Sequence, residues 1–172
     1  FKRPDEAIIL LGETEGWLGC SLYVRELCRN AGVAGSTWAP PPVDLAAERH
    51  TGDLVRSLIT SGQVTACHDV SDGGLLVAIA EMALAGNLGC AVDSMSGVPT
   101  HAYWFGEDQG RYIATTARPE TVLAAAQEAG VAAAVIGRTR TGPLTLDDTA
   151  LISLAELRAL HEAWLPRYMD GA

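Results

Sequence analysis

Short apolar runs alternate with stretches of helical periodicity along most of this chain, and glycines or prolines mark nearly every change from one to the other. The apolar runs predict strands over residues 7–11, 64–70, 88–92, 110–117 and 131–136. The periodic stretches predict helices over residues 18–31 and 43–61, and after Gly74, Pro119 and Ser153. This alternation predicts an α/β domain with a central mixed sheet and helices packed on it. A site is expected at the strand-to-helix turns.

Two helix starts carry their own signals. Ser71 or Asp72 is expected to cap the helix after Gly74, which would stabilise it by about 1 kcal/mol. The last helix begins with a capping box, in which Ser153 and Glu156 satisfy two amide donors reciprocally. Residues 94–100 are expected to form a loop.

The length of 172 residues suits a single domain spanning residues 1–172. Hydrophobic residues make up 48% of the chain, which is enough for a packed core and argues against a disordered protein. Charged residues make up only 19%, below the roughly 25% of typical soluble domains. An apolar part of the surface is therefore expected to be covered by another domain or subunit.

The formal net charge of −9 disfavours nucleic acid and anionic membranes as partners, because both attract clustered lysines and arginines. No stretch is apolar over the roughly 20 residues that a spanning helix needs, and no signal peptide is visible, so a cytoplasmic location is predicted. The chain opens at Phe1 and reaches its first strand almost at once. We therefore expect a fragment of a longer multidomain chain, with flexible ends at residues 1–6 and 167–172.

The four cysteines lie in apolar segments and form no C-x-x-C pair. They are Cys20, Cys28, Cys67 and Cys90. This usage favours buried, reduced thiols over disulfides or a zinc site. His50, His101 and His161 lie apart without ligand spacing and are assigned to helix faces or loops.

The densest group of chemically active side chains follows the buried strand that ends near residue 70. It contains an imidazole, two carboxylates, a hydroxyl and two glycines: His68, Asp69, Ser71, Asp72, Gly73 and Gly74. Glycines let a backbone approach a ligand, and the following helix offers its positive end. The carboxylates would repel a bare phosphate, but Mg²⁺ would reverse the local charge. A helix cap, a turn and a satisfied histidine explain the same residues equally well.

A second polar group lies over residues 105–111, between two predicted strands. Its polar members are Glu107, Asp108, Gln109 and Arg111. Together they could bind a polar ligand through hydrogen bonds and carboxylate contacts. Taken alone, a plain hairpin with an exposed Glu/Arg pair is the favoured interpretation.

The third group is the turn after the first strand. Its members are Gly12, Glu13, Gly19 and Ser21. A strand-to-helix turn of this kind can approach a phosphate, but G-x-G-x-x-G and G-x-x-x-x-G-K are both absent. A ligand loop and a tight structural turn are equally supported.

In this order, the three groups resemble the C-terminal domain of the phosphoribosylformylglycinamidine synthases, in the AIR synthase superfamily. The similarity covers residues 10–137. It rests on Gly-Glu-Thr at 12–14, Leu-Gly-Cys-Ser at 18–21 with Tyr23, His-Asp-Val-Ser-Asp-Gly-Gly-Leu at 68–75 with Ala80-Glu81, and Phe-Gly-Glu-Asp-Gln-Gly-Arg at 105–111.

The resemblance implies an AIR synthase C-terminal-like domain of a purine-pathway ligase. That enzyme joins formylglycinamide ribonucleotide to glutamine-derived ammonia, using ATP and Mg²⁺, and releases ADP and phosphate. It also implies two kinds of partner: preceding AIR synthase N-terminal-like domains of the same chain and a glutaminase. The catalytic histidine of the family belongs to those N-terminal domains. We therefore expect no catalytic residue in this chain and no activity of the isolated domain.

The resemblance also implies site roles. Asp69 would ligate the metal, and contacts to nucleotide or substrate would come from Gly12, Glu13, Gly19, Ser21, His68, Ser71, Asp72, Gly73, Gly74, Glu107, Asp108, Gln109 and Arg111. The His-Asp-Val-Ser-Asp-Gly-Gly form is similar to the second half of the enzyme, whose site in some members holds a structural nucleotide. Two positions depart from the family pattern: Cys20 stands where glycine is usual, and Asp108 where serine is common.

Two alternatives stay open at this point. The chain could belong to another ATP enzyme of the superfamily, of the AIR synthase, selenophosphate synthetase or thiamine-phosphate kinase type. It could instead be a non-catalytic interaction domain. The family interpretation requires the corner at residues 69–72 and the segment at 107–109 to converge on one lip of a nucleotide cleft, which a neighbouring domain completes.

Overall fold

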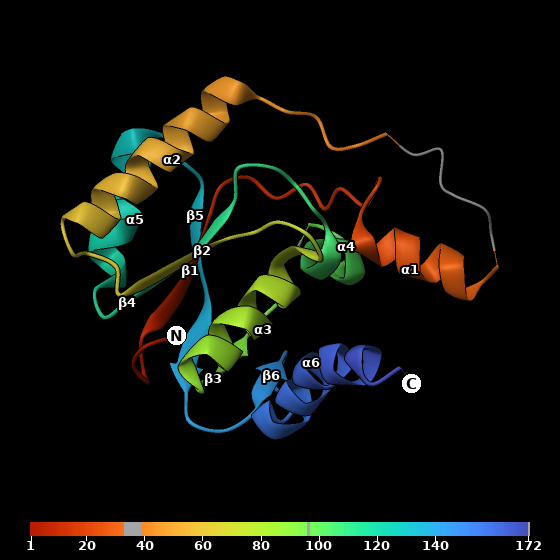
Figure 1. The fold of residues 1–172 in the computed structure, drawn as a ribbon. Helices are drawn as coiled ribbons and strands as arrows, with labels where there is room; N and C mark the ends of the chain where they lie inside the picture. The colour runs from red at the N-terminus through yellow and green to blue at the C-terminus, as the bar shows by residue number, and fades with distance from the viewer. Residues whose placement is uncertain (33–38, 96, 172) are drawn as a thin grey trace.

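The computed structural model describes residues 1–32, 39–95 and 97–171. Within these ranges the strands form one sheet in the order β2-β4-β1-β5-β3-β6-β7 (Figure 1). The strands are β1 (Ala7–Leu11), β2 (Ala66–Asp69), β3 (Gly89–Val92), β4 (Tyr112–Thr116), β5 (Ala133–Arg140), β6 (Leu144–Leu146) and β7 (Thr149–Ile152). Neighbours are antiparallel except β3 and β6, which are parallel. The predicted α/β class and mixed sheet are confirmed.

Helices cover both faces of this sheet (Figure 1). They are α1 (Leu22–Asn30), α2 (Leu45–Thr60), α3 (Gly74–Gly86), α4 (Thr100–Phe105), α5 (Pro119–Ala129) and α6 (Leu154–Met169). The buried strand β1 shows why there are two layers of helices, because successive side chains of a strand point to opposite faces. Ile9 and Leu11 pack with α2 and α5, while Ile8 and Leu10 pack with α3 and α4.

The structure contains three features that the sequence pattern did not predict. Helix α4 has only six residues, too few for a periodic signal, and it buries Tyr103 and Trp104. Strands β6 and β7 form a hairpin whose turn places Asp147 and Asp148 at positive φ. Strand β5 continues to Arg140 instead of ending at residue 136. In the expected loop at 94–100, residue 96 lies outside the described residues and Thr100 already begins α4.

The N-terminal end is packed onto the domain, so the prediction of a flexible segment at residues 1–6 is wrong. Phe1 is 5% exposed within the core cluster that contains α3, and Glu6 is 2% exposed. Gly86 makes room for this segment, since a Cβ there would lie 1.9 Å from the Phe1 carbonyl oxygen. Burial of the phenyl ring holds the segment in place. The C-terminal residues 167–171 are exposed, and α6 continues through them to Met169.

The cysteines differ in their surroundings. Burial raises the pKa of Cys67 to about 11 and that of Cys90 to about 12, so both thiols are protonated at neutral pH. Cys28 is partly buried. The prediction of a buried thiol is wrong for Cys20, which is exposed at positive φ in the turn before α1.

None of the helices in the described part of the chain is both long and apolar enough to cross a membrane.

Candidate functional site: a polar cleft at the ends of β2 and β4

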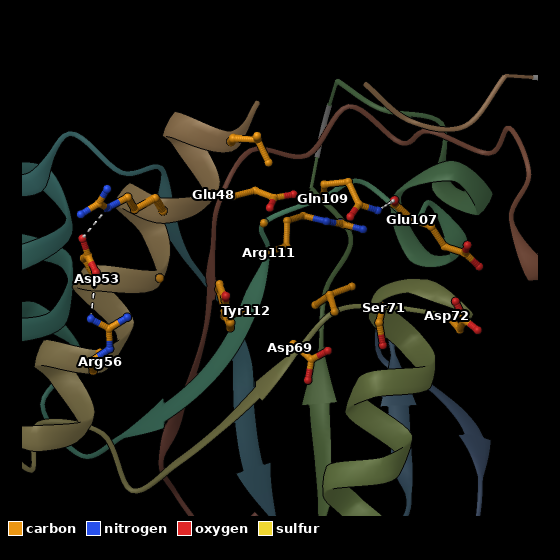
Figure 2. A pocket seen from close by; sticks show the side chains of 15 residues that line it. Glu48, Asp53, Arg56, Asp69, Ser71, Asp72, Glu107, Gln109, Arg111 and Tyr112 are labelled. Carbon is orange, nitrogen blue, oxygen red and sulfur yellow. Dashed lines mark hydrogen bonds and ion pairs between the residues drawn. The ribbon is translucent and has the colours of Figure 1, made fainter. Parts of the chain in front are cut away.

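A cleft of about 770 Å³ opens at the edge of the sheet where β2 ends and β4 begins (Figure 2). Asp69, the last residue of β2, pairs with Tyr112, the first residue of β4. The corner at residues 69–72 forms one wall, residues 107–112 form the second, and one face of α2 forms the third. The cleft therefore lies at a strand-to-helix turn, where the sequence analysis expected a site.

The corner and the segment near residue 108 converge as the family interpretation required. The amide of Gly73 donates to Oε1 of Glu107 at 2.8 Å. Gly73 and Gly74 both have positive φ, and a Cβ on Gly74 would lie 2.6 Å from the carbonyl oxygen of Gly106. Only glycine accommodates this conformation and this close approach at small cost.

The expected capping of α3 by Ser71 or Asp72 is wrong. Gly73 occupies the N-cap position, and no local side chain caps the helix. Glu107, more than thirty residues further along the chain, supplies the carboxylate instead. Ser71 and Asp72 are exposed and line the cleft.

The segment at residues 106–111 is a loop from α4 into β4, so the hairpin interpretation is also wrong. The Arg111 side chain is fully buried and donates Nη2 to the carbonyl oxygen of Gly106 at 2.7 Å. Its Nη2 also lies 3.5 Å from Oδ2 of Asp108. Asp108 accepts the amides of Gly16 and Trp17 at 3.0 and 2.9 Å. These two side chains use their charges to hold the loop.

Burial lowers the pKa of the Arg111 guanidinium, and the Asp108 carboxylate beside it opposes that shift. Gln109, in contrast, is exposed at the cleft, where its Nε2 donates to the Glu107 carbonyl oxygen at 3.3 Å. Of the four polar residues predicted here, Gln109 is the one with an exposed side chain at the cleft, and the Glu107 carboxylate is used within the protein by the Gly73 amide.

His68 is not brought into this cleft, although its sequence neighbour Asp69 is. Side chains alternate along a strand, so the two residues start from opposite faces of β2, although Nδ1 of His68 still lies 3.6 Å from Oδ1 of Asp69. The His68 Nδ1 contacts the Asp69 carbonyl oxygen at 2.6 Å, and its Nε2 lies 3.5 Å from Oε2 of Glu81. His68 lines a separate depression between α3 and α6.

The residues predicted in the turn after β1 also fall into two groups, one that lines a hollow and one with structural contacts. Gly12 and Glu13 line a neighbouring hollow of about 470 Å³ beside the start of α2, and Gln109 borders both hollows. Ser21 is 1% exposed and caps α1 by accepting the Val24 amide. Gly19 lies against the chain at residue 39, where a Cβ would be 2.1 Å from a backbone oxygen. Neither Ser21 nor Gly19 lines the cleft.

Helix α2 contributes cationic groups that the sequence analysis missed. Arg49 and Arg56 lie on the face of α2 that lines the cleft, and both pair with Asp53, at 3.9 and 2.9 Å. Both side chains are at least 75% exposed. The i, i+4, i+7 spacing of Arg49, Asp53 and Arg56 places all three on one helical face. This spacing is the sequence signal that could have predicted the charged face. The prediction of this helix rested on its apolar residues alone.

The described residues contain no cluster of three or more histidine, cysteine, aspartate or glutamate side chains that could hold a metal ion. The Asp69 side chain is 64% exposed in the cleft, with Asp72 on the same wall. Mg²⁺ commonly uses one or two carboxylates together with substrate phosphates and water. The donors present therefore fit such an ion as a partial ligand set.

Comparison with known proteins gives a family match and close relatives. The family model described as "AIR synthase related protein, C-terminal domain" matches residues 3–147. A relative from Methylocella silvestris, named phosphoribosylformylglycinamidine synthase subunit PurL, is 55% identical over 175 residues, which cover 100% of this chain and 23% of the relative. A relative of the same name from Rhodopseudomonas palustris (strain BisB5) is 50% identical over 99% of this chain and 23% of its own length. The chain thus spans about a quarter of these curated relatives.

Solved structures share the fold at low identity. Thermotoga maritima PurL complexed with FGAR superposes with a TM-score of 0.70 and 17% identity, covering 91% of this chain and 28% of that one. The same enzyme complexed with ATP gives 0.69 and 18%, covering 91% and 26%. Thiamine-monophosphate kinase from Stenotrophomonas maltophilia K279a gives 0.56 and 19%, covering 87% and 52%.

Proposed function

Because this chain belongs to the family of AIR synthase related C-terminal domains, we propose that it forms one wall of a nucleotide cleft in an ATP-dependent ligase of the phosphoribosylformylglycinamidine synthase type. The observation that carries this proposal is the 55% identity to a relative of that name across the whole chain. The cleft at the ends of β2 and β4 supports it, because it places exposed carboxylates opposite exposed arginines.

The parent enzyme would convert formylglycinamide ribonucleotide, ammonia from glutamine and ATP into the amidine, ADP and phosphate. In this reaction the γ-phosphoryl group of ATP is transferred to the amide oxygen of the substrate. Ammonia then attacks the amide carbon and displaces the phosphate. Catalysis of such a transfer depends mainly on positioning and charge stabilisation. This domain would contribute positioning, with the catalytic groups on the remaining domains and the ammonia supplied by a glutaminase.

The cleft offers complementary charges to a nucleotide polyphosphate. Arg49 and Arg56 on α2 can donate to phosphate oxygens, and guanidinium groups suit this role because of their planar donor geometry. Asp69 and Asp72 on the opposite wall would hold Mg²⁺, which neutralises phosphate charge when bound. Asp53 keeps both arginines oriented along the helix face.

Other parts of the proposal concern the parent protein. Its partners would be the AIR synthase N-terminal-like domains of the same polypeptide and a glutaminase subunit or domain, and its location would be the cytoplasm, where ATP, glutamine and the ribonucleotide occur. The family resemblance and the small fraction of the relatives that this chain covers support the first of these.

A second candidate function is that of a kinase in the same superfamily. The likeness to a thiamine-monophosphate kinase, with a TM-score of 0.56, supports it. An AIR synthase or selenophosphate synthetase type of enzyme would share the same cleft architecture.

The decisive experiment uses the full-length parent protein. It is incubated with ATP, Mg²⁺, formylglycinamide ribonucleotide and ammonium, which bypasses the glutaminase, and the amidine and ADP are measured by mass spectrometry. We expect both products in equal amounts. ADP formation that depends on thiamine phosphate and not on formylglycinamide ribonucleotide would favour the kinase. The 172-residue chain alone is expected to form neither product.

A further inference from the structure

One carboxylate oxygen at the cleft joins two helices that are far apart in the sequence. Oε1 of Glu107 accepts the amide of Leu22 at 2.8 Å and the amide of Gly73 at 2.8 Å. Leu22 is the first residue of α1, and Gly73 is the N-cap of α3. Both amides belong to the set of helix N-terminal donors that have no partner within their own helix.

Neither helix replaces this contact with a side chain of its own. Helix α3 has no local side-chain cap, and Ser21 at the start of α1 accepts the amide of Val24, so Leu22 depends on Glu107. A carboxylate at two converging helix N-termini is favoured by both helix dipoles. Removing the Glu107 carboxylate would leave both part-buried amides without a partner, and each unpaired donor costs free energy.

The backbone around Glu107 is held independently. The Glu107 amide donates to the carbonyl oxygen of Trp17 at 2.8 Å, and the neighbouring Asp108 carboxylate accepts the amides of Gly16 and Trp17. The Glu107 side chain therefore extends from a fixed loop to the two helix ends. Its position decides how the corner at residues 69–74 is placed relative to the segment before α1.

We propose that Glu107 is a positioning residue, which sets the geometry of the cleft by joining the start of α1 to the start of α3, and not a charged ligand of the nucleotide, metal or substrate. This inference rests on the proposed function, because it assigns Glu107 a role in that cleft. The required property of the side chain is an acceptor oxygen at the Oε1 position, and its negative charge is secondary.

Two substitutions in the full-length parent protein separate these properties. Glu107→Gln keeps an acceptor oxygen and removes the charge, whereas Glu107→Ala removes both. We expect Glu107→Gln to keep kcat/KM for ATP within about threefold, and Glu107→Ala to lower it by about tenfold or more, because two hydrogen bonds are lost. Glu128→Gln, at an exposed site on α5 away from the cleft, is the matched control.

Amide hydrogen exchange gives a second readout that does not depend on activity. Peptides containing Leu22 and Gly73 should exchange faster in Glu107→Ala and at the wild-type rate in Glu107→Gln. A general loss of stability would raise exchange throughout the domain, whereas loss of the Glu107 contacts should raise it at these two sites.

Two outcomes would overturn the proposal: a Glu107→Gln protein as impaired as Glu107→Ala while both amides stay protected, or unchanged protection in Glu107→Ala. If Glu107→Ala does not fold, the activity and exchange of Glu107→Gln decide the matter. A wild-type parent protein without ligase activity would refute the proposed function, and the exchange data would still test the joining of the two helices.

Discussion

At the residue scale, some polar side chains around the cleft are exposed to it, whereas others are buried and bound within the protein. Asp69 is exposed to the cleft, whereas Asp108 is 7% exposed and bound to two backbone amides and to Arg111. Both were predicted as ligand contacts from the same kind of evidence. Burial and hydrogen bonding separate them, because a carboxylate already satisfied by the protein has little left to offer a ligand.

Replacement of Arg111 tests this difference. Arg111→Met would leave the Asp108 carboxylate buried without its cation, so we expect the free energy of unfolding to fall by about 3–5 kcal/mol. Arg56→Met removes an exposed ion pair with Asp53 and should cost about 0–1 kcal/mol. Urea denaturation of both variants measures the two values. Similar small losses would show that the Arg111 contacts do not hold the loop.

The buried thiols predict a pH dependence. The pKa of Cys67 is about 11 and that of Cys90 about 12, against an ordinary value of 9 for the unfolded chain. Below pH 9 both states keep the protons. Above pH 9 the unfolded chain loses them first, so stability should fall as pH rises from 9 towards 11 and 12.

The double variant Cys67→Ala/Cys90→Ala provides the control for other groups that titrate in this range. We expect its urea midpoint to fall less between pH 8 and pH 10.5 than that of the wild type. An equal fall in both proteins would contradict the assignment to these thiols.

At the element scale, the corner between β2 and α3 depends on glycine for two separate reasons. Gly74 has a φ of +75°, and a Cβ there would meet the Gly106 carbonyl oxygen at 2.6 Å. Gly130, at the end of α5, has a φ of +67° and open space around the Cβ position. Comparing alanine at Gly74 and at Gly130 therefore separates the cost of the left-handed backbone conformation from the cost of the steric clash.

Gly130→Ala should lower the free energy of unfolding by about 1 kcal/mol, the ordinary cost of a left-handed conformation for an L-residue. Gly74→Ala should lower it by more than about 2 kcal/mol, because the backbone of the 105–107 segment must also move. Thermal or urea unfolding measures both. Equal losses would mean that the two segments are not in tight contact.

At the scale of the whole molecule, the cleft exists because α2 lies beside the point where β2 ends and β4 begins (Figure 2). Exposed apolar surface, expected from composition, is confirmed on α6, where large side chains are between 58% and 74% exposed: Leu160, Trp164, Leu165, Tyr168 and Met169. The rings of Trp164 and Tyr168 stack there at 5.2 Å.

The α2 arginines give a prediction for the assembled protein. In the full-length parent, the double variant Arg49→Gln/Arg56→Gln should weaken ATP binding about tenfold or more, since charge-assisted contacts to phosphate are lost. The melting temperature should change little, because both ion pairs with Asp53 are exposed. Titration calorimetry measures the affinity. Arg25→Gln, on the exposed surface of α1, serves as control, and an unchanged affinity in the double variant would remove α2 from the site.

The sequence by itself determined the alternation of strands and helices and the glycine corner after β2, because these follow from residue periodicity and from the conformational freedom of glycine. These are local properties of the chain. The convergence of the corner with the 107–109 segment was expected only through the family resemblance.

Only the tertiary structure decided which polar side chains face the cleft. It left His68 outside the cleft that Asp69 lines, buried Arg111 with Asp108, brought Glu107 to two distant helix starts, and placed Arg49 and Arg56 opposite the corner. The physical reason is that exposure and hydrogen-bond partners depend on contacts between segments tens of residues apart, which the periodicity of any one segment does not contain.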